Sequence, residues 1–133
     1  MRFFVVMTAL VGAAAILTGA FGAHALKETL IAKGSLSVWK TAELYHLMHA
    51  PAQLAACLYA DAHASARASR WLSRACTCWG LGIGLFSGSL YWMAVGGPHW
   101  LGPVTPFGGL LLIAGWLCVI GAAPTRPAAD PSV

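Results

Sequence analysis

One stretch of the sequence places three ionisable side chains at the spacing that helical metal and proton-transfer sites use. Glu43, His46 and His49 follow one another at intervals of three residues. At 100° per residue they fall on one stripe of a helix, which Gln53 and Cys57 extend. Histidine titrates near neutral pH, and a Glu-x-x-His pair is a building unit of di-iron helix bundles. The stripe therefore raises two chemical hypotheses, proton transfer and metal binding.

The metal hypothesis needs more ligands than the sequence supplies. A di-iron bundle takes Glu-x-x-His from two helices and further Glu residues from the others, whereas only one such helix is predicted here. Cys76 and Cys78 form a single C-x-C pair without the second pair that zinc sites add. The sequence contains no G-x-S-x-G, phosphate-loop or C-x-x-C-H motif. We therefore expect no metal site, no cofactor and no catalytic residues.

The composition determines the environment of these side chains. The chain has 133 residues, which is enough for one domain. Its hydrophobic fraction is 59% and its charged fraction 9%, against about 45–50% and roughly 25% in soluble domains. A fold of this size cannot bury so much apolar surface, so part of it must face lipid. The net charge of +4 is scattered between apolar runs, which argues against nucleic-acid binding.

The charge-poor segments predict four membrane spans. Residues 3–26 carry no charge, residues 41–60 carry only Glu43, and residues 75–125 are uncharged. The last segment exceeds the roughly 20 residues of one crossing and is broken by "GGPHWLGP" at residues 96–103. We predict spans at residues 3–26, 41–60, 75–95 and 104–123. They form an all-α integral membrane four-helix bundle, with residues 1–123 as one domain and residues 124–133 as a disordered tail.

The basic residues predict the orientation. Arg2, the arginines of residues 67–74 and Arg126 would share one side, and Lys27, Lys33 and Lys40 the other. The excess of positive charge places both termini in the cytoplasm, in a multi-pass protein of the bacterial inner membrane. "AHA" at residues 23–25 imitates a signal cleavage site, but the apolar segment before it exceeds the usual 7–15 residues, so we expect a retained first helix. Trp39 and Trp79 are predicted to be interfacial aromatics.

Small residues predict where helices approach each other closely. In lipid, such residues let helix backbones pack tightly. One glycine stripe runs along the first span and a tandem G-x-x-x-G along the third; the two seams consist of Gly12, Gly19 and Gly22, and of Gly80, Gly84 and Gly88. Each seam would serve packing within the bundle or, alternatively, a homodimer.

The chain resembles a family of small four-helix membrane proteins of unknown function, typified by bacterial YgdD-like proteins and the animal transmembrane protein 256. The matching pieces are "GAFGAHALKETL" (19–30), "VWKTAELYHLMHA" (38–50), "GLFSGSLYWMAV" (84–95) and "WLGPVTPFGGLLLIAGW" (100–116). The resemblance implies an integral membrane location and a retained first span. It implies no established activity.

Two functions remain open on these observations. The first is a non-enzymatic protein that acts by assembly or by binding a membrane partner, including another copy of itself. The second is a small transporter or proton-conducting element that uses the intramembrane stripe. We also predict that His24, Glu43 and His46 form a polar cluster that His49 extends inward, fastening the first two spans. The alternative is an interfacial His24 and a solvated Glu43.

The predicted topology is tested by thiol labelling. In a cysteine-free background, a cysteine at Ser35 should react with an impermeant maleimide in intact cells, because this loop faces outward. A cysteine at Ser69 should react only after the membrane is opened. The opposite pattern of labelling would reverse the orientation.

Overall fold

The computed structural model describes residues 2–62 and 65–124, and all the elements below lie within them. The four long helices are α1 (Arg2–Ala23), α3 (Leu36–Ala62), α4 (Ala66–Ala94) and α5 (Val104–Gly121). The short helix α2 (Lys27–Ala32) connects α1 to α3, and a 3-10 turn, η1 (His99–Leu101), connects α4 to α5. The described chain is all-helical, which confirms the predicted class.

Local sequence features end the helices. The "GAHA" stretch closes α1, since the amide of His24 donates to the Ala20 carbonyl at 3.0 Å and that of Leu26 to the Phe21 carbonyl at 2.8 Å. Gly34 has a φ of 65° and separates α2 from α3, a conformation that glycine adopts without steric cost. Ser65 caps α4 by accepting the Ala68 amide at 3.2 Å.

Two helices begin earlier than the predicted spans. Helix α3 begins at Leu36 instead of residue 41, and α4 begins at Ala66 instead of residue 75. The charge-free segment marks the part suited to lipid, whereas the helix continues through flanking charged residues because lysine and arginine have good helix propensity. Of the predicted tail, only Pro124 is described; residues 125–133 lie outside the described part.

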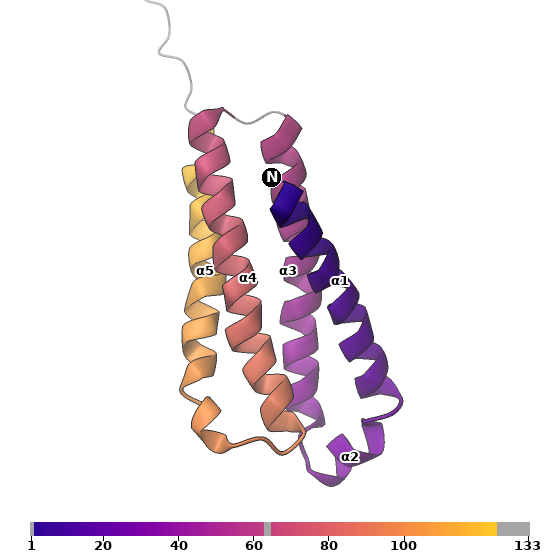
Figure 1. Cartoon of the computed structure of the whole chain (residues 1–133). Helices are drawn as coiled ribbons and strands as arrows, with labels where there is room; N and C mark the ends of the chain where they lie inside the picture. The colour runs from indigo at the N-terminus through magenta and orange to yellow at the C-terminus, as the bar shows by residue number, and fades with distance from the viewer. Residues whose placement is uncertain (1, 63–64, 125–133) are drawn as a thin grey trace, which may run out of the picture.

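The four long helices lie side by side in the order α1, α3, α4, α5 (Figure 1). Helix α1 packs on α3, α3 on α4, and α4 on α5, so α1 and α5 form the two edges of the row. A conventional four-helix bundle would bring the first and last helices together. The row differs from that expectation. Helices α1 and α5 need not pack against each other in a membrane, because lipid tails cover the outer faces of the row as well as another helix would.

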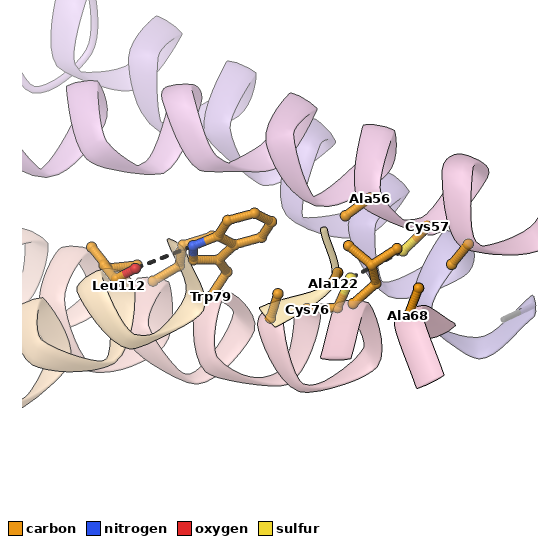
Figure 2. Packing of buried hydrophobic residues seen from close by; sticks show 11 residues of the cluster. Ala56, Cys57, Ala68, Cys76, Trp79, Leu112 and Ala122 are labelled. Carbon is orange, nitrogen blue, oxygen red and sulfur yellow. Dashed lines mark hydrogen bonds between the residues drawn. The ribbon is translucent and has the colours of Figure 1, made fainter. Parts of the chain in front are cut away.

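The tightest interface joins α4 to α5, where glycines of α5 admit bulky groups of α4. A Cβ atom at Gly108 would lie 2.8 Å from Cα of Phe86, and one at Gly121 would lie 2.7 Å from the ring of Trp71. Gly115 meets the Trp79 indole in the same way, and that indole donates to the carbonyl of Leu112 at 3.2 Å (Figure 2). Trp79 is 1% exposed, so its ring packs between helices and does not face the membrane surface.

Small residues fill the interface of α3 with α4. The core here contains Ala56 and Ala60 of α3 beside Ala68 and Ala75 of α4. In the same cluster the thiols of Cys57 and Cys76 lie 3.4 Å apart (Figure 2). Their close contact shows that these cysteines serve as small core residues, as a buried free cysteine usually does.

Some glycines of the predicted seams face another helix of the chain and others do not. On α1, Gly19 faces the Glu43 carboxylate, and Gly22 faces the Trp39 indole. By contrast, a Cβ at Gly12, Gly84 or Gly88 would lie in open space. Apart from the adjacent residues and the nearby backbone of its own helix, no atom of the described chain would lie within 4 Å of it. The reason is geometric. Helix α4 packs on α5 with the side opposite to Gly84 and Gly88, so the glycine that meets α5 is Gly82, beside Leu112. Gly80 contacts only Gln53, with 3.5 Å between its Cβ position and Nε2.

Large apolar side chains cover the outer surface of the row. Among the described residues, two segments are long and apolar enough to cross a bilayer by length and composition, Arg2–Ala23 and His99–Gly121. Both belong to the edge helices. Their outward side chains are largely exposed, and examples are Leu10, Ile16, Phe107, Ile113 and Ile120. The central helices α3 and α4 carry the polar residues.

Alanine substitutions distinguish a packed glycine from an open one. Gly108→Ala should destabilise the protein by about 1–3 kcal/mol, because the methyl group would overlap the backbone of α4. Gly84→Ala should leave stability unchanged or raise it by up to about 1 kcal/mol, because the site is open and alanine favours the helix. Thermal unfolding in detergent measures both. Equal destabilisation of the two variants would contradict the assigned interface.

Candidate functional site

The polar stripe of α3 lies on the face that meets α1 and α4. His46, His49 and Gln53 are buried, and Glu43 is partly buried. Helix α3 continues through Pro51, which has no amide hydrogen to donate to the preceding turn. The predicted stripe therefore exists as one face of one helix, and its surroundings decide what it can do.

His46 is the centre of a network that joins three helices. Its Nε2 lies 3.0 Å from the carbonyl oxygen of Val11 in α1, and its Nδ1 lies 3.4 Å from the hydroxyl of Tyr91 in α4. A carbonyl can only accept, so Nε2 carries the proton and Nδ1 accepts from the tyrosine. Both ring nitrogens are thus engaged with neighbouring helices.

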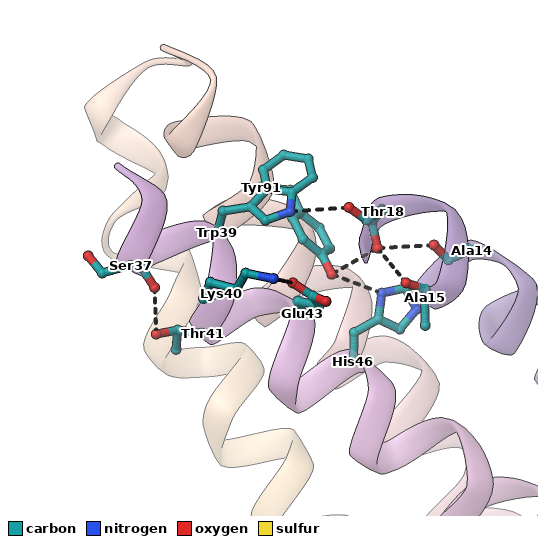
Figure 3. Close-up of polar contacts among 10 residues, drawn as sticks. All are labelled: Ala14, Ala15, Thr18, Ser37, Trp39, Lys40, Thr41, Glu43, His46 and Tyr91. Carbon is teal, nitrogen blue, oxygen red and sulfur yellow. Dashed lines mark hydrogen bonds and ion pairs between the residues drawn. The ribbon is translucent and has the colours of Figure 1, made fainter. Parts of the chain in front are cut away.

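Thr18 and Trp39 complete this network, as Figure 3 shows. The Thr18 hydroxyl lies 3.0 Å from the Tyr91 hydroxyl and can donate to it. The Trp39 indole donates to the Thr18 carbonyl at 3.2 Å and packs on the Tyr91 ring at 4.6 Å between centroids. Trp39 and His46 are seven residues apart in α3, as are their acceptors Thr18 and Val11 in α1. Helices α1 and α3, which run antiparallel, are therefore joined by two hydrogen bonds that fit the same alignment of the two helices.

Glu43 lies beside this network and not within it. Its Oε2 forms an ion pair of 2.7 Å with Lys40, whose side chain is 52% exposed. Its other oxygen lies against the α1 backbone at Gly19, where a Cβ would be 2.9 Å away. An ion pair this exposed contributes little to stability, but the absence of a side chain at residue 19 lets the carboxyl group approach α1.

His24 does not reach the predicted cluster. It lies just beyond the end of α1, it is exposed, and its side chain makes no hydrogen bond with any residue in the described ranges. The cluster of His24, Glu43 and His46 is therefore wrong as predicted. The physical reason is direction: at the end of α1, His24 points away from the face that carries Gly19 and Gly22. Tyr91 takes the place assigned to His24.

His49 connects α3 to α5 rather than extending the network towards α1. The Trp116 indole donates to its Nε2 at 3.2 Å, so Nε2 carries no proton. The proton is therefore on Nδ1, which donates to the Tyr45 carbonyl at 2.7 Å. The rings of Trp79 and Trp116 each lie 6.2 Å from the imidazole. Its two ring nitrogens are consequently both occupied, as in His46.

Gln53 and Ser87 fasten α3 to α4 through backbone carbonyls. Gln53 donates from Nε2 to the Cys76 carbonyl at 2.9 Å, and Ser87 donates to the Ala42 carbonyl at 2.9 Å. Ser87 is fully buried. Within the described residues Oε1 of Gln53 and Oγ1 of Thr8 have no hydrogen-bond partner. The side chains of His46, His49 and Gln53 each bond a neighbouring helix through Nε2, whereas Nδ1 of His49 bonds within α3.

Sequence reasoning missed four members of this arrangement: Thr18, Ser87, Tyr91 and Trp116. A signal for them existed, because each polar group within a long apolar helix needs a partner in lipid. The identity of the partner did not follow, since most acceptors are backbone carbonyls, which every residue carries. Only the register between helices selects Val11 and Thr18.

Comparison with known proteins places the chain among membrane proteins. A family model described as "Protein of unknown function (DUF423)" matches residues 18–109. A UPF0382 membrane protein of Staphylococcus saprophyticus is 38% identical over 122 residues, which cover 90% of this chain and 95% of the relative. A UPF0382 membrane protein of Bacillus subtilis is 37% identical over 126 residues, 92% and 97% of the two chains.

A relative also occurs in a yeast. The UPF0382 membrane protein of Schizosaccharomyces pombe is 31% identical over 119 residues, 86% of this chain and 95% of its own length. No solved structure is significantly similar to this chain. The region matched by the family model contains α2, α3 and α4 entirely, together with Thr18.

Double-mutant cycles test the revised network. His46→Gln and Tyr91→Phe should be non-additive in unfolding free energy by about 0.5–1 kcal/mol, which is typical of hydrogen bonds between membrane helices. His24→Ala and Glu43→Gln should be additive within about 0.5 kcal/mol, because the two side chains do not meet. Unfolding in mixed micelles provides the measurement. Coupling of the second pair and none in the first would restore the original cluster.

Proposed function

Since the chain belongs to the DUF423 family, whose relatives include UPF0382 membrane proteins, we propose that it is a non-enzymatic membrane protein that binds another membrane-embedded helix. The binding surface is the exposed face of α4, which we call the α4 outer face and define by Gly84, Gly88, Leu81, Leu85 and Trp92. One observation carries the proposal: α4 has two interior glycines that no contact with another helix of the described chain explains.

The cost of these glycines supports a partner. A glycine in the middle of a helix is about 0.8–1.0 kcal/mol less favourable than alanine. Most glycines elsewhere in the helices admit a neighbouring side chain or backbone, as Gly22, Gly108 and Gly115 do. Gly84 and Gly88 admit no group from residues 2–62 and 65–124. A second helix that approaches the backbone of α4 would use the space, as in the small-xxx-small contacts of membrane helices.

The shape of the α4 outer face fits such a contact. A hollow of about 550 Å³ runs along Gly84 and Gly88 and is bordered by Trp92, Trp100, Leu101 and Val104. Trp92 and Trp100 are 59% and 70% exposed. Large aromatic side chains around a hollow are the usual anchors of an interface.

The state of the polar stripe supports a non-enzymatic role over the proton-conducting alternative. His46 has both ring nitrogens bonded to neighbouring helices, and His49 has one bonded to α5 and the other to a carbonyl of α3 itself. Within residues 2–62 and 65–124, no three His, Cys, Asp or Glu side chains gather as potential metal ligands. The two buried histidines of the stripe are therefore engaged in structure.

The topology completes the proposal. All four long helices would cross the bilayer, in keeping with the resemblance to YgdD-like proteins and transmembrane protein 256. Lysines near α2 and the start of α3 would lie outside, and Arg67, Arg70 and Arg74 at the start of α4 would lie in the cytoplasm. In bacteria the membrane would be the inner membrane.

Photo-crosslinking tests the binding surface. A photoreactive amino acid replacing Leu81 should give a discrete crosslinked protein in native membranes. Gly84→Leu should reduce that product at least tenfold, because leucine fills the approach path without disturbing the fold. Gly12→Leu, at an open glycine of α1, is the matched control and should leave the product unchanged. Crosslinks to lipid alone, or a product indifferent to Gly84→Leu, would refute the proposal.

A further inference from the structure

On the opposite side of α4, the structure forms an apolar groove between α3 and α5. These two helices flank α4 and do not pack closely against each other, so α4 is the floor of the groove. Towards the Ser65 end it widens into a chamber of about 470 Å³, lined by Ala52, Ala55, Tyr59, Leu72, Val119 and Ala122. Towards the η1 end a second chamber of about 650 Å³ is lined by Leu44, Met48, Phe86, Leu110 and Ile113.

A polar bridge separates the two chambers. Trp116 extends from α5 and donates to His49 of α3 at 3.2 Å, and its ring lies 5.0 Å from that of Trp79 at an interplanar angle of 63°. Trp116 lines both chambers and is still 51% exposed. The indole therefore presents its faces to whatever occupies the groove, while its only polar atom is already paired.

We propose that the groove binds an acyl chain of a membrane phospholipid. The linings offer hydrocarbon and aromatic rings, and the polar or ionisable residues among them are His49, Tyr45 and Tyr59. The two ring nitrogens of His49 are bonded to Tyr45 and Trp116. The neighbouring surfaces of α3 and α5 expose Leu58, Leu117 and Ile120, so the groove opens towards hydrocarbon. A chain that fills it restores the dispersion contacts that the walls otherwise lack.

The bridge favours a flexible chain over a helix. An α-helix is about 10–12 Å across with its side chains, and a straight one along the groove would meet the Trp116–His49 hydrogen bond midway. A helix could enter only by breaking that bond and leaving two polar groups unpaired in an apolar setting, which is costly. A polymethylene chain can bend around the indole or occupy one chamber. This site is independent of the proposed partner surface, which lies on the other side of α4.

Native mass spectrometry tests the proposal directly. Protein purified in mild detergent is mixed with dioleoyl phosphatidylethanolamine, and the retained lipids per protein chain are counted. The wild type should retain at least one. Ala55→Trp, which fills the chamber near Ser65 from α3, should reduce retention at least tenfold. Ala13→Trp changes an alanine of α1 that is also exposed and lies outside the groove, and this variant should retain lipid like the wild type.

A second variant keeps the result interpretable. Ala123→Leu narrows the same chamber from the end of α5, so it should lower retention even if Ala55→Trp unfolds. Thermal unfolding of each variant establishes that the fold persists. Equal retention by the wild type and both groove variants would overturn the proposal. Loss of a protein dimer instead of a lipid adduct would also overturn it, and would assign the groove to a second copy of the chain.

Discussion

The structure depends on hydrogen bonds from side chains of one helix to backbone carbonyls of the next. His46 and Trp39 donate to α1, Gln53 and Ser87 join α3 to α4, and Trp79 donates to α5. Each helix pair in the row is therefore fixed by at least one such bond. In lipid there is little hydrophobic drive between helices, so packing and these bonds must hold them together. The carbonyl acceptors remain in their own helical bonds and use a second lone pair.

Glycines make these bonds possible by letting indole rings approach. Trp39 fits over Gly22, and Trp79 over Gly115. In both cases the same indole donates to a carbonyl of the helix that carries the glycine, Thr18 or Leu112. Close approach and hydrogen bonding are thus one feature repeated at two interfaces. The glycines of α4 at residues 84 and 88 lack this use among the described residues, which is why they support a surface for another helix.

Sequence reasoning could predict the helices and the polar face but not the partners. The charge-poor segments located four long helices, and the 100° periodicity placed His46, His49 and Gln53 together on a buried face. It misplaced His24, because the end of α1 turns that residue outward. It also took Trp39 and Trp79 for interfacial residues, although they are 5% and 1% exposed. The indole N–H can donate to water and lipid headgroups at the membrane surface or to a backbone carbonyl of another helix. The register between the helices determines which of the two acceptors it meets.

The central claim is that the glutamate and histidine stripe holds helices together and does not move protons. Proton flux into proteoliposomes with an internal pH dye, under an imposed gradient, tests it most directly. We expect the wild-type protein to carry no flux above protein-free liposomes between about pH 5 and 8, the range in which histidine titrates. A flux that exceeds this baseline and disappears in Glu43→Gln or His46→Gln, while folding persists, would contradict it.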